Sequence, residues 1–305
     1  MKHTKVAVVQ SQPFLFETDK TIAKMWDLLA EIKDESPDMV LFPEAFLPGY
    51  PRGLTFGAVV GSRSQEGREL YARYYNNAIA IGDSRFKDLQ NIVRELEADL
   101  AIGVVEKDDK GGTLYCSIFY FGSNGDFLGK HRKLKPTGSE RLIWGEGDGS
   151  TLPVFNTGFG IYGALICWEN YMPLARMAMY QQGVQIYLAP TADCRDSWLT
   201  TLQHIATEGR CFVLGCNQLI TPDAYPEDIR SIIHDPSTIS CTGGSVIIGP
   251  GGKILAGPIL NEEGILYADL DLEEVIKGKY EFDVAGHYNR PDVFAFRVNT
   301  GSGAH

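Results

Sequence analysis

Cys167 is the residue whose position in the sequence best suits covalent chemistry. The apolar run 161–166 has the length of a buried strand, and a helical pattern begins after the cysteine. Cys167 is therefore expected on a strand-to-helix turn, where the free N–H groups of a helix N-terminus favour a thiolate, the nucleophilic form of the side chain. A buried, inert cysteine is the alternative interpretation. The other chemistry-bearing residues have to decide between the two.

Two further stretches place ionisable side chains near expected strand ends. The strand 38–42 runs into a Pro- and Gly-rich segment, so Glu44 lies just past a strand end. The basic segment 130–135 presents Lys133 and Lys135 on the same face of an expected strand. A lysine buried beside a carboxylate and a thiol stays cationic and can donate to negative charge that develops on an attacked atom. Spacing alone does not choose between the two lysines, and a solvated basic edge is the alternative.

The elements that must position these residues follow a repeated order. In the first half, strands alternate with amphipathic helices and end in a hairpin: strands 5–10, 38–42 and 100–106, helices 19–33, 66–82 and 86–96, and hairpin strands 113–121 and 127–133. The second half repeats the outline with strands 161–166, 184–189 and 211–218, a helix after Cys167, a helix at 197–210, and hairpins at 244–257 and 265–270. This order predicts an α/β fold with mixed sheets, outer helices and active groups at strand carboxyl ends.

No linker or low-complexity tract divides the chain. We therefore expect one domain over residues 1–305, with the segment from about 280 to 305 as a tail. The stretch 219–240 is long for a structureless connection and is expected to form a surface or interface loop.

Composition excludes several classes of protein. A net charge of −11 over 305 residues argues against a nucleic-acid or acidic-membrane surface and favours a small-molecule substrate. The six cysteines and six histidines show no metal-ligand spacing, so we expect no metal site. No segment has membrane-spanning length and no secretory signal is recognisable, so a cytoplasmic location is expected. The GxGxxG match at 158–163 precedes a strand rather than following one, which argues against a dinucleotide site.

Three segments resemble, in the same order, the signature regions of the nitrilase superfamily. They are Phe42-Pro43-Glu44-Ala45-Phe46 with Pro48-Gly49-Tyr50-Pro51, then His131-Arg132-Lys133-Leu134-Lys135-Pro136-Thr137, then Cys167-Trp168-Glu169-Asn170-Tyr171-Met172-Pro173. Cys-Trp-Glu and the segment 140–149 are similar to the nitrilase branch itself. The resemblance covers nearly the whole chain. It implies an α/β fold in the form of a four-layer α-β-β-α sandwich.

The resemblance also implies a catalytic triad of Glu44, Lys133 and Cys167. Lys133 is preferred to Lys135 because the family's lysine follows the arginine of this motif, as Lys133 follows Arg132. The implied activity is hydrolysis of an organic nitrile to a carboxylic acid and ammonia, through a cysteine thioimidate and thioester and without a cofactor.

Several other residues receive expected roles. A second family glutamate corresponds to Glu140, which would position the lysine or the substrate; a surface ion pair with its neighbour Arg141 is the alternative. Trp168, Tyr50 and Phe46 are expected to line an apolar substrate cleft, with ordinary core packing as the alternative.

The remaining expectations concern alternative functions, the main product and the assembly state. An amidase or carbamoylase of the same superfamily is the second hypothesis, and a non-enzymatic interaction module, which would be expected to lack a triad residue, is the third. Related cyanide hydratases tend to have histidine where Asn170 stands, so we expect acid rather than amide as the main product. The resemblance further implies a homodimer or higher oligomer, through the helices flanking Cys167 or the loop 219–240. Some members of the family form spiral filaments that depend on a C-terminal extension, and we do not expect such filaments here.

Overall fold

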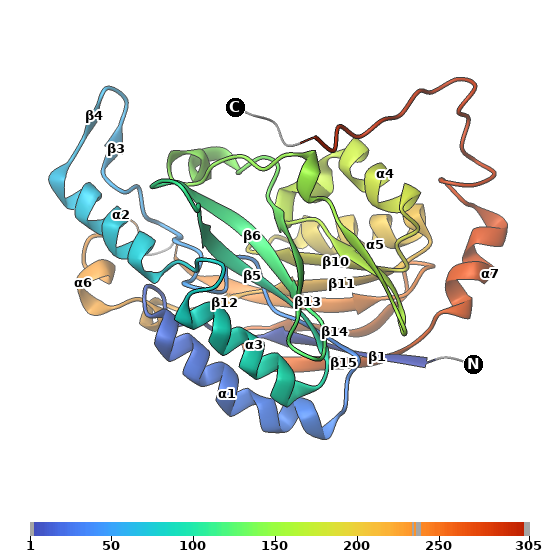
Figure 1. Cartoon of the computed structure of the whole chain (residues 1–305), viewed down its shortest axis with the longest axis horizontal. Coiled ribbons are helices and arrows are strands. Elements are labelled where there is room, and N and C mark those ends of the chain that lie inside the picture. The colour runs from blue at the N-terminus through green and yellow to red at the C-terminus, as the bar shows by residue number, and fades with distance from the viewer. Residues whose placement is uncertain (1–2, 234, 236–238, 302–305) are drawn as a thin grey trace.

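The computed structural model describes residues 3–233, 235 and 239–301, and its centre is a pair of mixed β-sheets (Figure 1). The strands of the first sheet are, in spatial order, β15 (Gly264–Asp271), β1 (His3–Gln10), β2 (Met39–Leu41), β5 (Asp99–Lys107), β6 (Leu114–Phe121) and β7 (Phe127–Arg132). Strands β1, β2 and β5 are parallel, whereas β15, β6 and β7 join antiparallel.

The second sheet repeats this arrangement. Its strands are β12 (Leu219–Ile220), β13 (Cys241–Ile248), β11 (Phe212–Asn217), β10 (Ile186–Thr191), β9 (Gly160–Ala164) and β8 (Val154–Thr157), with β14 (Ile254–Leu260) paired to β13. Strands β9, β10 and β11 are parallel, and β8 and β13 flank them antiparallel. The repeat of a parallel trio in both halves agrees with the element order expected from the sequence.

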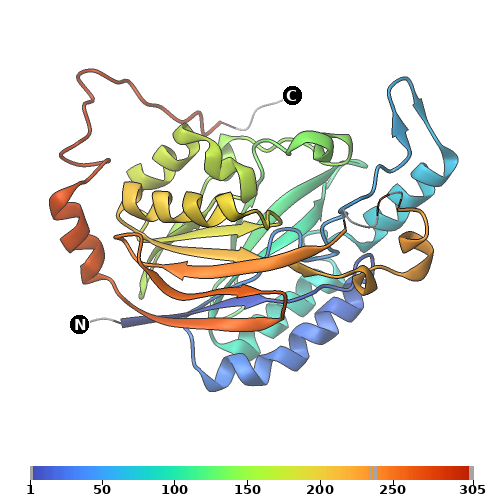
Figure 2. The ribbon, with the colours of Figure 1, turned by 180° about the vertical axis from the view of Figure 1, so that it is seen from behind.

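Helices cover the outer face of each sheet. Helices α1 (Thr18–Asp34) and α3 (Ser84–Leu96) lie outside the first sheet, and α4 (Pro173–Gln181) and α5 (Asp196–Gly209) lie outside the second (Figures 1 and 2). Three apolar layers separate these four structural layers. Val6 and Val8 of β1 face the second sheet, whereas Ala7 and Val9 face the helices. Because both faces of β1 are buried, its sequence is continuously apolar instead of alternating. The fold is thus the four-layer α-β-β-α sandwich that the resemblance of the three motifs implies.

The remaining elements lie around this core. They are the short strands β3 (Ala58–Val59) and β4 (Ser62–Arg63), the helices α2 (Gln65–Asn77), α6 (Glu227–Arg230) and α7 (Glu273–Glu281), and the 3₁₀ helices η1 (Gly138–Leu142), η2 (Gly149–Thr151), η3 (Cys167–Tyr171) and η4 (Pro222–Ala224). After α7, residues 282–301 contain no helix or strand. Residues 302–305 of the expected tail, and 234 and 236–238 of the expected loop, lie outside the described residues. No helix within the described part of the chain is long and apolar enough to cross a membrane.

Three expectations for individual elements were wrong. The helix expected to reach residue 82 ends at Asn77, after which Ile79 bonds with the edge of β5. The strand expected over 161–166 ends at Ala164, so two extended residues separate it from Cys167. The segment 265–270 is not a local hairpin, because β15 leaves the second half of the chain and pairs with β1 of the first sheet.

Candidate active site

Glu44 lies on a tight turn just past the end of β2. Ala45 has a φ of 46°, a left-handed conformation that turns the chain sharply. Gly103 in β5 makes room for this turn, because a Cβ at that position would lie 2.1 Å from the carbonyl oxygen of Pro43. The turn presses against the sheet, and the carboxylate of Glu44 is fully buried.

The buried carboxylate of Glu44 has a donor on each oxygen. The ammonium of Lys133 donates to Oε1 at 2.6 Å, and the backbone N–H of Ala192, just past β10, donates to Oε2 at 2.9 Å. Burial raises the pKa of Glu44, while the charge of Lys133 opposes the shift. A carboxylate in such a site is a stronger base than one in water.

Lys133 is fully buried and lies directly after β7. Its ammonium bonds Glu44 and also Glu140 Oε2, at 2.9 Å. Burial alone would lower the pKa of Lys133, but the charges of Glu44, Cys167 and Glu140 hold the pKa well above its ordinary value. Lys135, in contrast, has half of its side chain exposed and pairs with Glu146 at the surface. The structure therefore places Lys133, and not Lys135, beside the carboxylates.

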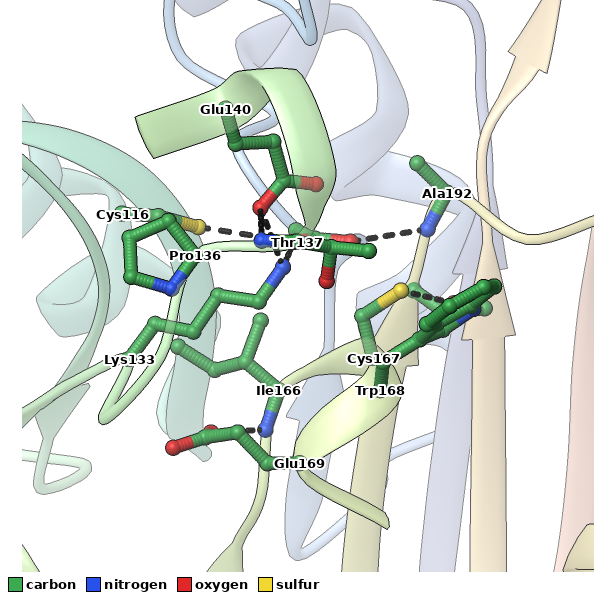
Figure 3. A network of polar contacts seen from close by, with 12 residues as sticks. Cys116, Lys133, Pro136, Thr137, Glu140, Ile166, Cys167, Trp168, Glu169 and Ala192 are labelled. Atoms are coloured by element: carbon green, nitrogen blue, oxygen red, sulfur yellow. Dashed lines mark hydrogen bonds and ion pairs between the residues drawn. The ribbon is translucent and has the colours of Figure 1, made fainter. Parts of the chain in front are cut away.

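Cys167 begins the five-residue helix η3 and has a φ of 50°, a strained conformation for a residue with a side chain. Its sulfur accepts a hydrogen bond from Thr191 Oγ1 at 3.1 Å. Figure 3 shows Cys167 on one side of the polar network, with Lys133 extending toward the centre from the other side. Burial and the charge of Glu44 raise the pKa of Cys167 well above its ordinary value, which outweighs the opposing effect of Lys133. Burial thus opposes the thiolate form that the turn position was expected to favour.

Glu140 belongs to this network and is not a surface residue. Its Oε2 accepts from Lys133 and from the backbone N–H of Thr137 at 2.6 Å (Figure 3). Its Oε1 accepts from the Tyr50 hydroxyl at 2.7 Å. The alternative of an ion pair with Arg141 does not apply, since the Arg141 side chain donates to the carbonyl of Pro136. Glu140 is therefore a second carboxylate, beside Glu44, that holds the ammonium of Lys133.

A pocket of about 290 Å³ opens onto the sulfur of Cys167. Tyr50 and Trp168 line it, and the Trp168 indole N–H donates to Asp193 at 2.8 Å. Phe46 does not line this pocket. It is fully buried among the apolar side chains between the first sheet and its helices, so its expected role in substrate binding is corrected to core packing. The turn at Ala45 sends Phe46 into that layer.

Glu169 is a residue whose importance was not recognised from the sequence. Its buried carboxylate accepts from the backbone N–H of Ile166, the neighbour of Cys167, at 2.7 Å (Figure 3). It also accepts from the backbone N–H of Leu134, the neighbour of Lys133, at 2.6 Å. It also bonds His131 Nε2 at 2.9 Å. Burial alone would lower the pKa of His131, but the charge and hydrogen bond of Glu169, together with a hydrogen bond to the Thr151 carbonyl, raise it overall. Glu169 thus connects the segments that carry the lysine and the cysteine, and its place in Cys-Trp-Glu was the one available signal.

Asn170 lies behind the cysteine. Its amide donates to the carbonyls of Leu165 and Cys167, at 2.9 and 2.8 Å, and its oxygen accepts from Tyr187 at 2.7 Å. Asn170 therefore holds the backbone of Cys167 and does not line the pocket. Within the described ranges, no group of three or more His, Cys, Asp or Glu side chains is arranged to hold a metal ion.

The α-β-β-α sandwich and its site can now be compared with known protein families. Residues 5–280 match the family model of carbon-nitrogen hydrolases. The chain belongs to the carbon-nitrogen hydrolase family, and it is an enzyme that hydrolyses carbon–nitrogen bonds.

Individual relatives agree with this assignment. The chain is 49% identical over 296 residues to a nitrilase of Bradyrhizobium diazoefficiens, with 97% of this chain and 92% of the relative covered. It is 47% identical over 299 residues to a bifunctional nitrilase/nitrile hydratase of Nicotiana tabacum, with 96% and 85% covered. A solved structure of a mutant of the Nesterenkonia AN1 amidase, from the nitrilase superfamily, matches with a TM-score of 0.70 over 92% of this chain and 95% of that one. At 20% identity, this match bears on the fold alone.

Proposed function

We propose that the protein is a nitrilase, which converts an organic nitrile and two waters into a carboxylic acid and ammonia. The names of the relatives support nitrile hydrolysis. The observation that carries the mechanism is a chain of contacts that begins at the pocket, which Cys167 and Glu140 line. Behind the pocket, the ammonium of Lys133 bonds Glu140 at 2.9 Å and Glu44 at 2.6 Å. The triad supplies a nucleophile, a base and a proton donor without a cofactor.

The first half of the reaction forms a covalent thioimidate. Cys167 rests as a thiol, so its proton has to leave as the sulfur attacks, and the raised pKa of Glu44 suits this carboxylate to accept that proton. The C–S bond forms, one π bond of the carbon–nitrogen triple bond breaks, and the nitrogen takes a proton from Lys133. Because Lys133 donates directly to Glu44, the proton from sulfur can return to the lysine.

The second half releases both products. Water adds to the thioimidate as Glu44 takes its proton, which gives a tetrahedral intermediate. The nitrogen leaves once it is protonated, so ammonia departs and a thioester remains. A second water, activated by the same carboxylate, breaks the C–S bond and releases the acid with Cys167 as a thiol. Expulsion of sulfur from the first tetrahedral intermediate would instead give the amide, which we expect as a minor product.

The test is ammonia release from matched nitriles and amides, with chromatography of the products. We expect acid and ammonia from nitriles, little amide, and no turnover by Cys167→Ala. Predominant amide would indicate a nitrile hydratase. Rapid amide hydrolysis without turnover of any nitrile would place the enzyme among amidases, and no turnover of either would favour the interaction module.

A further inference from the structure

Arg52 lies on the wall between two pockets. It lines the 290 Å³ pocket that contains Cys167 and a neighbouring pocket of about 230 Å³, together with Tyr50 and Glu140. Its guanidinium donates to the carbonyl of Ala192, and the N–H of the same residue donates to Glu44. Ala192 therefore fixes the position of the Arg52 cation relative to the base of the proposed reaction.

The guanidinium of Arg52 has unused binding capacity. The Nε of Arg52 is buried without a hydrogen-bond partner, and the guanidinium carbon Cζ lies 5.5 Å from the centre of the Tyr50 ring. In the described part of the chain, no carboxylate forms an ion pair with it. Arg195, the other arginine of the pocket, is neutralised by Asp193 and stacks over Trp168 at 4.7 Å. Arg52 is thus the cation of this pocket that an incoming anion can reach.

The carboxylates nearby are occupied by other donors. Both oxygens of Glu44 and both of Glu140 accept hydrogen bonds from Lys133, Tyr50 or backbone N–H groups. The groups that act on Arg52 electrostatically are the thiols of Cys241 and Cys194 and the phenols of Tyr50 and Tyr225. A hydrogen bond from Cys241, more than the charge of Arg52, lowers the pKa of Cys194 to about 5. A thiolate at Cys194 is therefore the competing partner that a test has to remove.

We propose that Arg52 binds a carboxylate on the substrate, so that the preferred substrates are short cyano-carboxylates with the nitrile carbon at Cys167 and the carboxylate at Arg52. The planar fork of N–H donors on a guanidinium matches the two oxygens of a carboxylate. This inference rests on the proposed nitrilase function and adds the substrate class.

The experiment compares two nitriles of matched shape, 3-cyanopropanoate and uncharged 4-methylpentanenitrile, at constant ionic strength. We expect the wild-type enzyme to prefer the anion in kcat/KM. In Arg52→Gln, the ratio of anion to neutral kcat/KM should fall on the order of 10- to 100-fold, chiefly through KM for the anion. Arg52→Lys should retain part of the preference, because an ammonium keeps the charge but loses the fork. Both kcat/KM values of a ratio are measured on the same variant. A general loss of activity from a displaced Ala192 would lower both values and leave their ratio unchanged.

Two control variants isolate the contribution of the Arg52 guanidinium. Arg63→Gln removes an exposed arginine of β4, outside both pockets, and should leave the ratio unchanged. Cys194→Ser removes the competing thiolate and should keep or increase the preference for the anion. Turnover of the neutral nitrile without a preference for the anion, or an equal ratio in wild type and Arg52→Gln, would overturn the role of Arg52 and leave the nitrilase proposal standing. No turnover of either nitrile, together with amide hydrolysis, would overturn both.

Discussion

Replacing Lys133 by methionine tests the centre of the proposed site. Methionine keeps much of the side-chain volume, so the variant removes the buried ammonium without opening a large cavity. Glu44 and Glu140 then face each other without the cation that both of them bond. Removing one partner of a buried ion pair costs about 3–5 kcal/mol of unfolding free energy. We expect a loss of this size in urea unfolding at pH 7, and no detectable ammonia release from nitriles.

The dependence of this loss on pH follows from the carboxylate left behind. Burial already raises the pKa of Glu44, and without Lys133 the opposing effect is gone. A carboxyl group whose pKa is higher in the folded than in the unfolded state stabilises the fold at low pH, and this stability is lost as pH rises through the folded pKa. The deficit of Lys133→Met relative to wild type should therefore be smaller at pH 5 than at pH 8.

Lys135→Met is the matched control. Lys135 makes an exposed ion pair with Glu146, and such pairs contribute about 0–1 kcal/mol. This variant should keep its activity and its urea midpoint. Equal losses in the two variants, or a stability deficit in Lys133→Met that does not grow with pH, would refute the assignment of Lys133 to the site.

Three further predictions use other residues. Cys167→Ala should abolish turnover with an unchanged circular dichroism spectrum, and measurable turnover would remove Cys167 as the nucleophile. Glu169→Gln replaces a carboxylate oxygen that accepts a backbone N–H, so it should cost about 1–3 kcal/mol in urea unfolding and lower kcat more than it changes KM; a change confined to KM would contradict its positioning role. We also expect at least a dimer through the segment after Cys167, where Leu174 is 69% exposed. Leu174→Arg should then reduce the mass in light scattering, whereas Ile276→Arg on α7 should not, and a monomeric wild type would exclude this interface.

Local patterns were sufficient for the order of elements and for part of the site. Apolar runs of strand length and helical stripes such as that of α1 predicted that order, because periodicity reports which faces are buried. The same patterns put Glu44 and Cys167 just past strand ends, where parallel strands bring side chains to one edge. The four-layer arrangement itself came from the resemblance of three motifs, since periodicity does not state how two sheets stack.

The tertiary structure determines which groups the side chains near those strand ends contact. In an extended chain Glu44 and Phe46 would point the same way, but the left-handed Ala45 between them sends one to the site and the other to the core. Burial, which no local pattern measures, raises the pKa of the Cys167 thiol and distinguishes the buried Lys133 from the exposed Lys135. The sequence by itself determined the types of reactive groups and the strands that carry them. The bonds of Glu169 to both reactive segments, and the position of Arg52 beside Ala192, join residues that are distant along the chain, so only the packing of one sheet on the other could specify them.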